Sequence, residues 1–229
     1  MSEYIFKRKN ADNIEFLGDF EGLYSNEDNP WSQLQEDTAR DEPMSYFYGY
    51  SRPLYLRFVK KLLKPNSIVA EIGCGLGETT ALLANNTPNN EFFGVDISQT
   101  AIAKAKVRHK KIDFFCGDIL KGPTYKKANV IILSNMLWYV LHDLKNLREN
   151  IERSFKQSGE SRYLVVQNAL FKGDQSYGKE KVSSIGDMTD LFIELFSKDR
   201  FTVSCFSEFH KLPETSAHDF GLLALELKV

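Results

Sequence analysis

Two spacings of hydrophobic residues follow one another along most of the chain. Short apolar runs, which are typical of buried strands, alternate with segments in which apolar residues recur every three or four positions, as on one face of a helix. The predicted strands are 67–72, 91–96, 112–116, 129–133, 162–168, about 201–210 and 219–228. The predicted helices are 53–63, 77–84, 99–110, 144–155 and 188–196.

Strands that alternate with helices predict an α/β fold, in which helices cover both faces of a mostly parallel sheet. The last two strands are joined by residues 211–218, which are too few to hold a crossover helix, so these strands should pair antiparallel. The pattern therefore predicts a Rossmann-like, seven-stranded, mostly parallel sheet with a C-terminal antiparallel strand.

The N-terminal part of the chain lacks this alternation. Residues 1 to about 30 are polar with short apolar patches, which predicts a covering arm or a partly disordered segment. Aromatic residues then accumulate, and Pro53 is a residue that can start a helix. We therefore expect an N-terminal arm and helical lid at 1–53 and one domain at 54–229.

Composition and charge narrow the class of protein. The 229 residues are 42% hydrophobic and 26% charged with a formal net charge of −2, which gives no electrostatic reason to expect a nucleic-acid partner. The three cysteines are scattered, without a disulfide framework or the spacing of metal ligands. No window reaches the length of a membrane span. We expect a cytoplasmic protein with reduced thiols, no metal and no membrane partner.

A glycine-rich turn connects the first strand of the sheet to the next helix. The sequence E-I-G-C-G-L-G-E covers 71–78, and glycines at alternate positions let a ligand approach bare backbone. A dinucleotide fingerprint that started at Gly73 would need a glycine where this chain has Glu78, whose carboxylate would repel a pyrophosphate. The plainer alternative is a tight turn without a ligand.

This turn resembles the cofactor-binding motif of class I S-adenosylmethionine-dependent methyltransferases. The resemblance implies the strand order 3-2-1-4-5-7-6, S-adenosylmethionine as cofactor and S-adenosylhomocysteine (SAH) as product. Asp96, which ends the second strand, matches the ribose-binding acid, although a helix N-cap is the alternative role. Asp118 and Ile119 match the adenine-binding position, although Asp118 alone is only a loop acid. The cofactor-binding residues that we expect are Glu71, Gly73, Cys74, Gly75, Gly77, Asp96, Ile97, Asp118, Ile119, Ser134, Asn135, Tyr50 and Arg52.

The segment after the fourth strand is expected to face the methyl acceptor. Its pattern L-S-x-x-L-W-Y-V-L resembles a segment of nodulation-type N-methyltransferases that act on amino sugars, and Asn29-Pro30-Trp31 is similar to an Asp-Pro-Trp of that group. Asn135 stands where that group has a glutamate, so a carboxylate base is not implied. His142 is the candidate base, with a solvated helix residue as the alternative. Of Trp138 and Tyr139, one is expected to wall the methyl site and the other to fill the core, with Tyr139 towards the cofactor.

Two further segments are candidates for covering the acceptor. Tyr46, Tyr50 and Arg52 are expected to close over the cavity, with Arg52 on the carboxylate of the cofactor, unless this stretch only packs a helix on the sheet. The connection 171–186 is long, and such loops are often functional, so it should help to select the substrate.

The sequence thus predicts a methyltransferase that acts on a nitrogen or oxygen of a small molecule, such as a sugar or amino sugar. The alternatives are a protein or RNA substrate, and a cofactor-binding partner subunit without turnover. A dehydrogenase that uses NAD is disfavoured by Glu78. Whether the protein is a monomer or a homodimer stays open.

Overall fold

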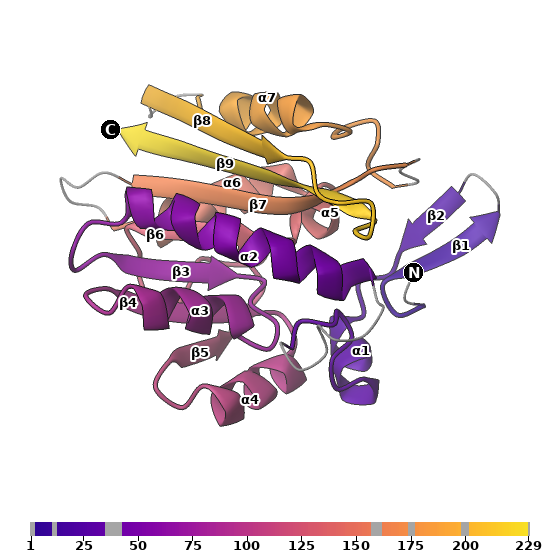
Figure 1. Cartoon of the computed structure of the whole chain (residues 1–229), viewed down its shortest axis with the longest axis horizontal. Helices are drawn as coiled ribbons and strands as arrows, with labels where there is room; N and C mark the ends of the chain where they lie inside the picture. The colour runs from indigo at the N-terminus through magenta and orange to yellow at the C-terminus, as the bar shows by residue number, and fades with distance from the viewer. Residues whose placement is uncertain are drawn as a thin grey trace.

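The computed structural model describes residues 3–10, 13–34, 43–156, 162–173, 177–197 and 202–228. Its centre is a seven-stranded sheet with the strand order β5-β4-β3-β6-β7-β9-β8 (Figure 1). The strands are β3 (Ile68–Ile72), β4 (Glu91–Asp96), β5 (Asp113–Cys116), β6 (Val130–Ser134), β7 (Arg162–Phe171), β8 (Thr202–His210) and β9 (His218–Lys228).

Strands β3 to β7 pair parallel, whereas β9 pairs antiparallel with both β7 and β8. Counted along the sheet strands of the chain, this is the order 3-2-1-4-5-7-6, so the predicted topology is confirmed. The carboxyl ends of the parallel strands meet at one edge of the sheet, and β9 begins at that same edge because His218 pairs with Phe171.

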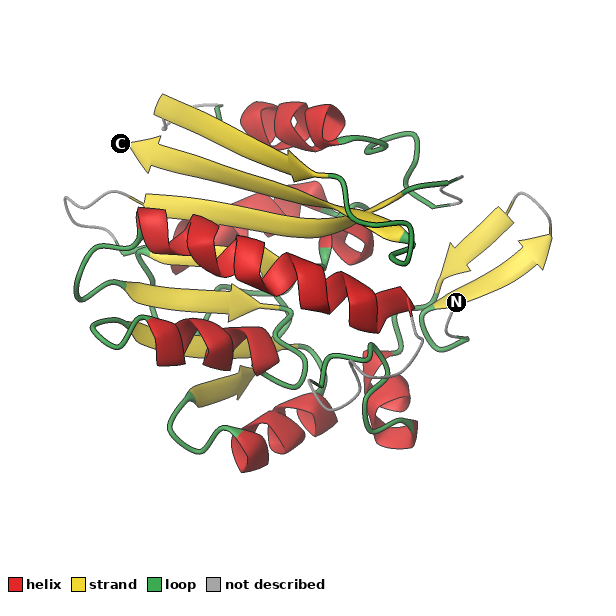
Figure 2. Cartoon of the chain, viewed as in Figure 1, coloured by secondary structure: helices red, strands yellow, loops and turns green. Residues whose placement is uncertain are grey.

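Helices cover both faces of the sheet, as Figure 2 shows. They are α2 (Pro43–Leu62), α3 (Glu78–Asn86), α4 (Gln99–Arg108), α5 (Leu137–Val140), α6 (Leu144–Ser154) and α7 (Ile185–Phe196). Alternate side chains of β6 point to opposite faces of the sheet. Val130 and Ile132 pack with α2, whereas Ile131 and Leu133 pack with α6 and α7. Period-two burial of this kind fixes the register of a strand that is buried on both sides. None of the described helices combines the length and apolar composition that a membrane crossing requires.

Helix α2 starts earlier than the sequence predicted. Pro53 lies inside the helix, which begins at Pro43, so the predicted start at Pro53 is wrong. A proline in a helix removes one backbone hydrogen bond. The turns before it are nevertheless helical because Phe47 and Ser51 continue the buried face that Tyr55 and Phe58 carry onto the sheet. The predicted boundary between 53 and 54 therefore falls within one continuous helix.

The N-terminal residues form regular structure at the carboxyl edge of the sheet. Strands β1 (Phe6–Asn10) and β2 (Asn13–Phe16) pair antiparallel as a hairpin, and α1 (Phe20–Asn26) follows them. In Figure 1 the hairpin extends beyond the ends of the central strands. Residues 1–2, 11–12 and 35–42 of the predicted arm and lid, and 174–176 of the predicted loop, lie outside the described residues.

Helix α1 is attached to the N-terminus of α4 by polar contacts. The Glu21 carboxylate accepts hydrogen bonds from Ser98 Oγ at 2.7 Å and from the Thr100 backbone N–H at 3.2 Å. Lys104 donates to the Tyr24 carbonyl at 2.8 Å. These contacts hold the first described helix next to the strand ends, where the candidate site lies.

Candidate active site

A cavity of about 700 Å³ lies over the carboxyl ends of the parallel strands. Residues at the ends of β3, β4, β5, β6 and β7 line it from the sheet, and residues of the hairpin, α1 and α2 line it from the other side. In open α/β sheets, the carboxyl ends of the strands are where ligands bind. This cavity is therefore the candidate active site.

The glycine turn has the backbone conformation that its sequence predicts. Gly73, Gly75 and Gly77 have φ values of +77°, +53° and +81°, in the left-handed region that disfavours other residues. A Cβ on Gly75 would lie 2.6 Å from Tyr24 Oη, and one on Gly77 would lie 2.6 Å from Phe114 Cζ. Gly73 lines the cavity, whereas Gly75 and Gly77 do not, and the neighbours that they approach are Tyr24 of α1 and Phe114 of β5.

Asp96 is held at the end of β4 by the turn beside it. Its carboxylate accepts hydrogen bonds from the Gly75 N–H at 2.8 Å and from the Ser98 N–H at 3.0 Å, and it lines the cavity. Ser98 is the N-cap of α4, since its hydroxyl accepts from the Ala101 N–H at 3.0 Å. The alternative role of Asp96 as the N-cap is thus taken by Ser98. Burial raises the pKa of Asp96.

Glu71 is the second buried acid of the cavity wall. Its side chain is at the end of β3, the residue is 2% exposed, and it accepts a hydrogen bond from the Thr80 hydroxyl. Burial raises its pKa to about 7, against the opposing effect of hydrogen bonds from Thr80 and Ser134. This carboxyl therefore changes its charge near neutral pH.

Asp118 and its neighbours line the cavity after β5. The Asp118 carboxylate accepts a hydrogen bond from the Leu120 N–H at 2.9 Å, and it lies 3.3 Å from the Lys121 ammonium. Ile119 is buried, whereas Ile97, which also lines the cavity, is 43% exposed. An exposed isoleucine beside two acids offers apolar surface to a planar ligand.

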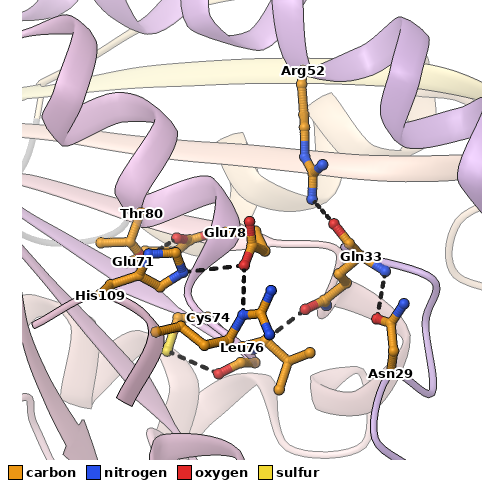
Figure 3. A network of polar contacts seen from close by, with 11 residues as sticks. Asn29, Gln33, Arg52, Glu71, Cys74, Leu76, Glu78, Thr80 and His109 are labelled. Atoms are coloured by element: carbon orange, nitrogen blue, oxygen red, sulfur yellow. Dashed lines mark hydrogen bonds and ion pairs between the residues drawn. The ribbon is translucent and has the colours of Figure 1, made fainter. Parts of the chain in front are cut away.

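Cys74 and Glu78 take structural positions in the turn. Cys74 lines the cavity, and burial raises the pKa of its thiol, so it stays protonated. Glu78 starts α3 and contacts Arg108 and His109, each at 3.1 Å (Figure 3). Burial raises the pKa of Glu78, but the hydrogen bonds from His109 and Arg108 outweigh it, so the pKa is lowered. Glu78 thus joins α3 to α4 and does not line the cavity.

Arg52 reaches from α2 toward the glycine turn through Gln33, as Figure 3 shows. Its guanidinium donates to the Gln33 carbonyl, and the Gln33 side chain accepts from the Leu76 N–H at 3.3 Å. The Arg52 guanidinium lies 4.9 Å from the centre of the Tyr48 ring. Its Nε is buried and has no hydrogen-bond partner within the described part of the chain.

Two of the predicted lid residues, Tyr50 and Arg52, do not line the cavity. Tyr50 is 40% exposed and is not among the residues that line the cavity, and neither is Arg52. Tyr48 lines it instead, and its hydroxyl shares hydrogen bonds with Gln33 and Asn135. Tyr48 and Tyr50 project from different faces of α2, which the composition of this stretch did not distinguish.

The segment after β6 forms part of the cavity wall. Asn135 has a φ of +51°, and its side-chain oxygen accepts from the Ala169 N–H at 2.9 Å, which ties β6 to β7. Ser134, Asn135, Tyr139 and His142 all line the cavity. Burial holds the pKa of Tyr139 above its usual range, so this phenol keeps its proton. His142 is exposed at the cavity surface.

Aromatic side chains from distant segments meet around Tyr139. The ring centroids of Phe20, Phe16 and Trp31 lie 5.0, 6.0 and 6.3 Å from that of Tyr139. Phe6 lies 4.9 Å from Tyr177, which follows β7. Tyr177 belongs to the connection 171–186, which was expected to help select the substrate, whereas Phe6 and Phe16 were not predicted as site residues. The alternation of Ile14 and Phe16 with polar residues was a local signal of a strand.

His218 is another cavity residue that the sequence reading missed. It begins β9, lines the cavity, and lies 4.8 Å from the ring of Phe171. Its Nδ1 is buried and has no hydrogen-bond partner among the described residues. Burial lowers the pKa of His218, so its ring is neutral at pH 7.

The sheet order, the glycine turn and the cavity at the strand ends together define a Rossmann-like methyltransferase fold. A family model described as a methyltransferase domain matches residues 69–159. Residues 69–159 of this chain thus match a methyltransferase domain, and the sheet order is the one that the resemblance of its turn to class I S-adenosylmethionine-dependent methyltransferases implies.

Curated relatives match parts of the chain. It is 31% identical to the malonyl-[acyl-carrier protein] O-methyltransferase of Anoxybacillus flavithermus, over 44% of this chain and 40% of the relative. It is 30% identical to the trans-aconitate 2-methyltransferase of Variovorax paradoxus, over 41% of this chain and 37% of the relative. These matches span less than half of the length of either relative.

Solved structures match more of the chain at lower identity. The N-methyltransferase NodS from Bradyrhizobium japonicum WM9, in complex with SAH, has a TM-score of 0.59 and 19% identity, and the match covers 88% of this chain and all (100%) of NodS. The plantazolicin methyltransferase BpumL, with a substrate analogue and SAH, has a TM-score of 0.57 and 16% identity, with 91% and 94% covered. At such identities the likeness concerns the fold alone.

Proposed function

We propose that this protein transfers a methyl group from S-adenosylmethionine to a nitrogen or oxygen of a small molecule. The observation that carries this proposal is the arrangement of Gly73, Asp96 and Asp118 at the ends of three neighbouring strands, on one cavity wall. The matched methyltransferase domain contains all three of these residues.

The residues of this wall fit the parts of the cofactor. Asp96 suits the two hydroxyls of a ribose, and Ile97, Asp118 and Ile119 suit an adenine that is apolar on its faces and polar on its edge. Glu71 suits the ammonium group of the methionine part, because opposite charges attract strongly in a buried site.

Arg52 supplies an independent observation in favour of the cofactor. Its Nε is a buried donor without a hydrogen-bond partner among the described residues, and buried donors in native proteins are nearly always satisfied. We propose that the carboxylate at the end of the cofactor's methionine part satisfies this donor when the cofactor is bound, which requires the Arg52 side chain to turn toward the cavity that it does not line here. Ser134 and Asn135 line the cavity next to Glu71 and complete that end of the site.

Bound S-adenosylmethionine supplies a methyl group that its sulfonium already activates toward displacement. The protein's part is to orient the acceptor in line and to exclude water. Tyr139 keeps its proton, so its hydroxyl orients the acceptor and does not act as a base. His142, at the cavity surface, is the side chain that we assign to receive the proton of the acceptor.

The proposal also includes the class of methyl acceptor, the cellular location and the partners of the protein. The relatives are named for malonyl-[acyl-carrier protein] and trans-aconitate, and NodS for N-methylation, so the neighbours themselves differ in their acceptors. We expect a cytoplasmic enzyme with a small-molecule acceptor and without nucleic-acid or membrane partners. The second candidate function is a partner subunit that binds the cofactor without turnover.

Calorimetry with SAH tests the cofactor assignment. We expect binding to the natural protein and a loss of at least about 100-fold in Asp96→Ala, since two hydrogen bonds to a carboxylate contribute about 1.5–3 kcal/mol each. Asp113→Ala is the matched control, because Asp113 is exposed on β5 and pairs with Lys126 outside the cavity. Binding of NAD without binding of SAH would overturn the proposal. Transfer of a labelled methyl group separates an enzyme from a silent binder.

A further inference from the structure

The cavity is divided by charge. Its acidic lining residues are Glu71, Asp96 and Asp118, all at the ends of β3, β4 and β5. From β6 to β9, no described lining residue is an aspartate, glutamate, lysine or arginine. The second half of the cavity thus presents an uncharged wall.

That uncharged half is walled by aromatic rings, which we call the ring chamber. The ring chamber consists of Phe6, Phe16, Phe20, Trp31, Tyr139 and Tyr177. Each ring centroid lies within 6.3 Å of another in the set, and none of the six side chains is fully buried. Half-buried rings that face a cavity offer apolar area to a ligand, with preferred edge-to-face and offset contacts for another ring.

No described residue that lines the cavity is a lysine or arginine, and two nearby lysines bind backbone carbonyls. Lys172 donates to the Leu212 and Pro213 carbonyls at 2.7 Å, and Lys181 donates to the Leu141 carbonyl at 2.5 Å. A carboxylate or phosphate in the ring chamber would lose water without gaining an ion pair there, which costs several kcal/mol. The described residues therefore disfavour an anionic acceptor.

His218 provides one polar contact in the cavity. Its Nδ1 is a buried nitrogen without a hydrogen-bond partner in the described part of the chain, at a residue that lines the cavity. Buried polar atoms of this kind require a partner, such as a ligand hydroxyl. A sugar carries several hydroxyls, each of which would need a partner that the rings do not offer.

We infer that the methyl acceptor is an uncharged aromatic molecule with a hydroxyl group, whose ring contacts Tyr139, Phe16 and Tyr177 and which forms a hydrogen bond with His218. This inference rests on the proposed function and specifies the substrate class of the same site. The acceptor enters the half of the cavity that the acids leave free.

Calorimetry on protein saturated with SAH tests the class of acceptor. The probes are 2-naphthol, its saturated counterpart decahydro-2-naphthol, glucosamine and trans-aconitate. We expect 2-naphthol to bind about threefold to tenfold more tightly than decahydro-2-naphthol, since ring–ring contacts add about 0.5–1.5 kcal/mol beyond burial. Glucosamine and trans-aconitate should bind more weakly still. Equal affinity for the saturated alcohol, or tighter binding of glucosamine or trans-aconitate, would overturn the inference.

Matched variants locate the binding. Phe16→Leu and Tyr177→Leu remove a ring and keep apolar bulk, so they should weaken 2-naphthol about threefold or more and leave SAH affinity unchanged. Phe209→Leu is the control, because Phe209 is 49% exposed on β8 and does not line the cavity. Unchanged 2-naphthol affinity in both ring variants, with normal SAH binding, would refute the ring chamber as the acceptor site.

The role of His218 has its own readout. The ratio of 2-naphthol affinity to naphthalene affinity measures the contact with the hydroxyl, and we expect His218→Phe to reduce that ratio about fivefold, the effect of one hydrogen bond. An unchanged ratio would remove His218 from the inference. Failure of the natural protein to bind SAH would instead overturn the proposed function on which the inference rests.

Discussion

The two halves of the cavity are built in different ways. The acidic half consists of residues at the carboxyl ends of β3, β4 and β5: Glu71 and Asp96 belong to their strands and Asp118 lies two residues after β5, so the sheet itself positions them. The ring chamber takes its residues from the hairpin, from α1 and the residues after it, from α5 and from the residues after β7. One half is thus part of the central sheet, and the other is assembled from segments placed around it.

This difference separates what is general from what is particular in the site. Strand ends hold a ligand at fixed spacing, which suits a cofactor that every reaction of the enzyme shares. Appended segments can vary without disturbing the sheet, which suits an acceptor that differs between relatives. We therefore expect substitutions in the acidic half to change SAH affinity and the stability of the fold, and substitutions in the ring chamber to change the affinity for the acceptor.

The largest effect is expected at the glycine turn. Gly75→Ala places a Cβ in the left-handed region and 2.6 Å from Tyr24 Oη, so it should lower the free energy of unfolding by about 2 kcal/mol or more and weaken SAH binding. Gly122→Ala is the control, because no atom lies within 4 Å of its added Cβ. Denaturant unfolding and SAH titration measure both effects. Equal stability of the two variants would contradict the tight contact between the turn and α1.

A substitution in the hairpin should affect use of the methyl acceptor and leave SAH binding nearly unchanged. Phe16→Ala removes a ring whose centroid lies 6.0 Å from that of Tyr139 and 5.5 Å from that of His142, so we expect kcat/KM for the methyl acceptor to fall about tenfold. SAH affinity should change less than twofold. A larger loss of SAH affinity than of kcat/KM for the acceptor would contradict the assignment of cofactor and acceptor to different halves of the cavity.

The pH dependence of SAH binding sharpens the role of Glu71. Because burial raises its pKa to about 7, the folded protein keeps a proton that the unfolded chain loses above pH 4.5. This group therefore reduces stability as the pH rises from about 4.5 to 7, and the reduction levels off above 7. The carboxylate form attracts an ammonium group, so SAH affinity should rise up to about tenfold between pH 6 and pH 8.

Glu71→Gln provides the comparison for this pH profile. The amide keeps the shape of the side chain and an oxygen for the Thr80 hydroxyl, but it does not titrate. SAH affinity of this variant should stay level between pH 6 and pH 8. The same rise in both proteins would assign the pH dependence to another group.

The smallest effect is expected where α1 meets α4. Hydrogen bonds from Thr100 and Ser98 lower the pKa of Glu21 to about 2, so its contribution to stability is present above the unfolded pKa and is lost as the pH falls through about 2. The side chain is exposed, so Glu21→Gln should cost only about 0.5 kcal/mol at pH 7. Urea unfolding measures this against Glu214→Gln on the exposed connection before β9. Equal stability of the two variants at pH 7 would remove Glu21 from the docking of α1.

The sequence predicted the sheet half well because its signals are local. Each apolar run, the glycine turn and each acid at a strand end can be recognised within a stretch of a few residues. The strand order came from the resemblance of the turn to class I methyltransferases and not from the period of the apolar residues, and the structure has that order.

The ring chamber was not predictable in the same way. Phe6 and Phe16 contact Tyr139 and Tyr177, which lie far from them in the sequence. The spacing of apolar residues within one helix or strand gives no information about such long-range contacts. Pro53 suggested a helix start, but burial of Phe47 on the same face as Tyr55 extends the helix through it. Tyr48 and Tyr50 belong to the same aromatic-rich stretch, so composition does not distinguish them. Their positions around the axis of α2 do, because only Tyr48 faces the cavity.

Amide hydrogen exchange with and without ligands tests most directly that one cavity has a cofactor half on the sheet and an acceptor half on the appended segments. We predict that SAH slows exchange at 73–77, 96–98 and 117–120, and that adding 2-naphthol slows exchange in β1 and β2. The contradicting result would be SAH protection that is absent from the strand ends and confined to the hairpin.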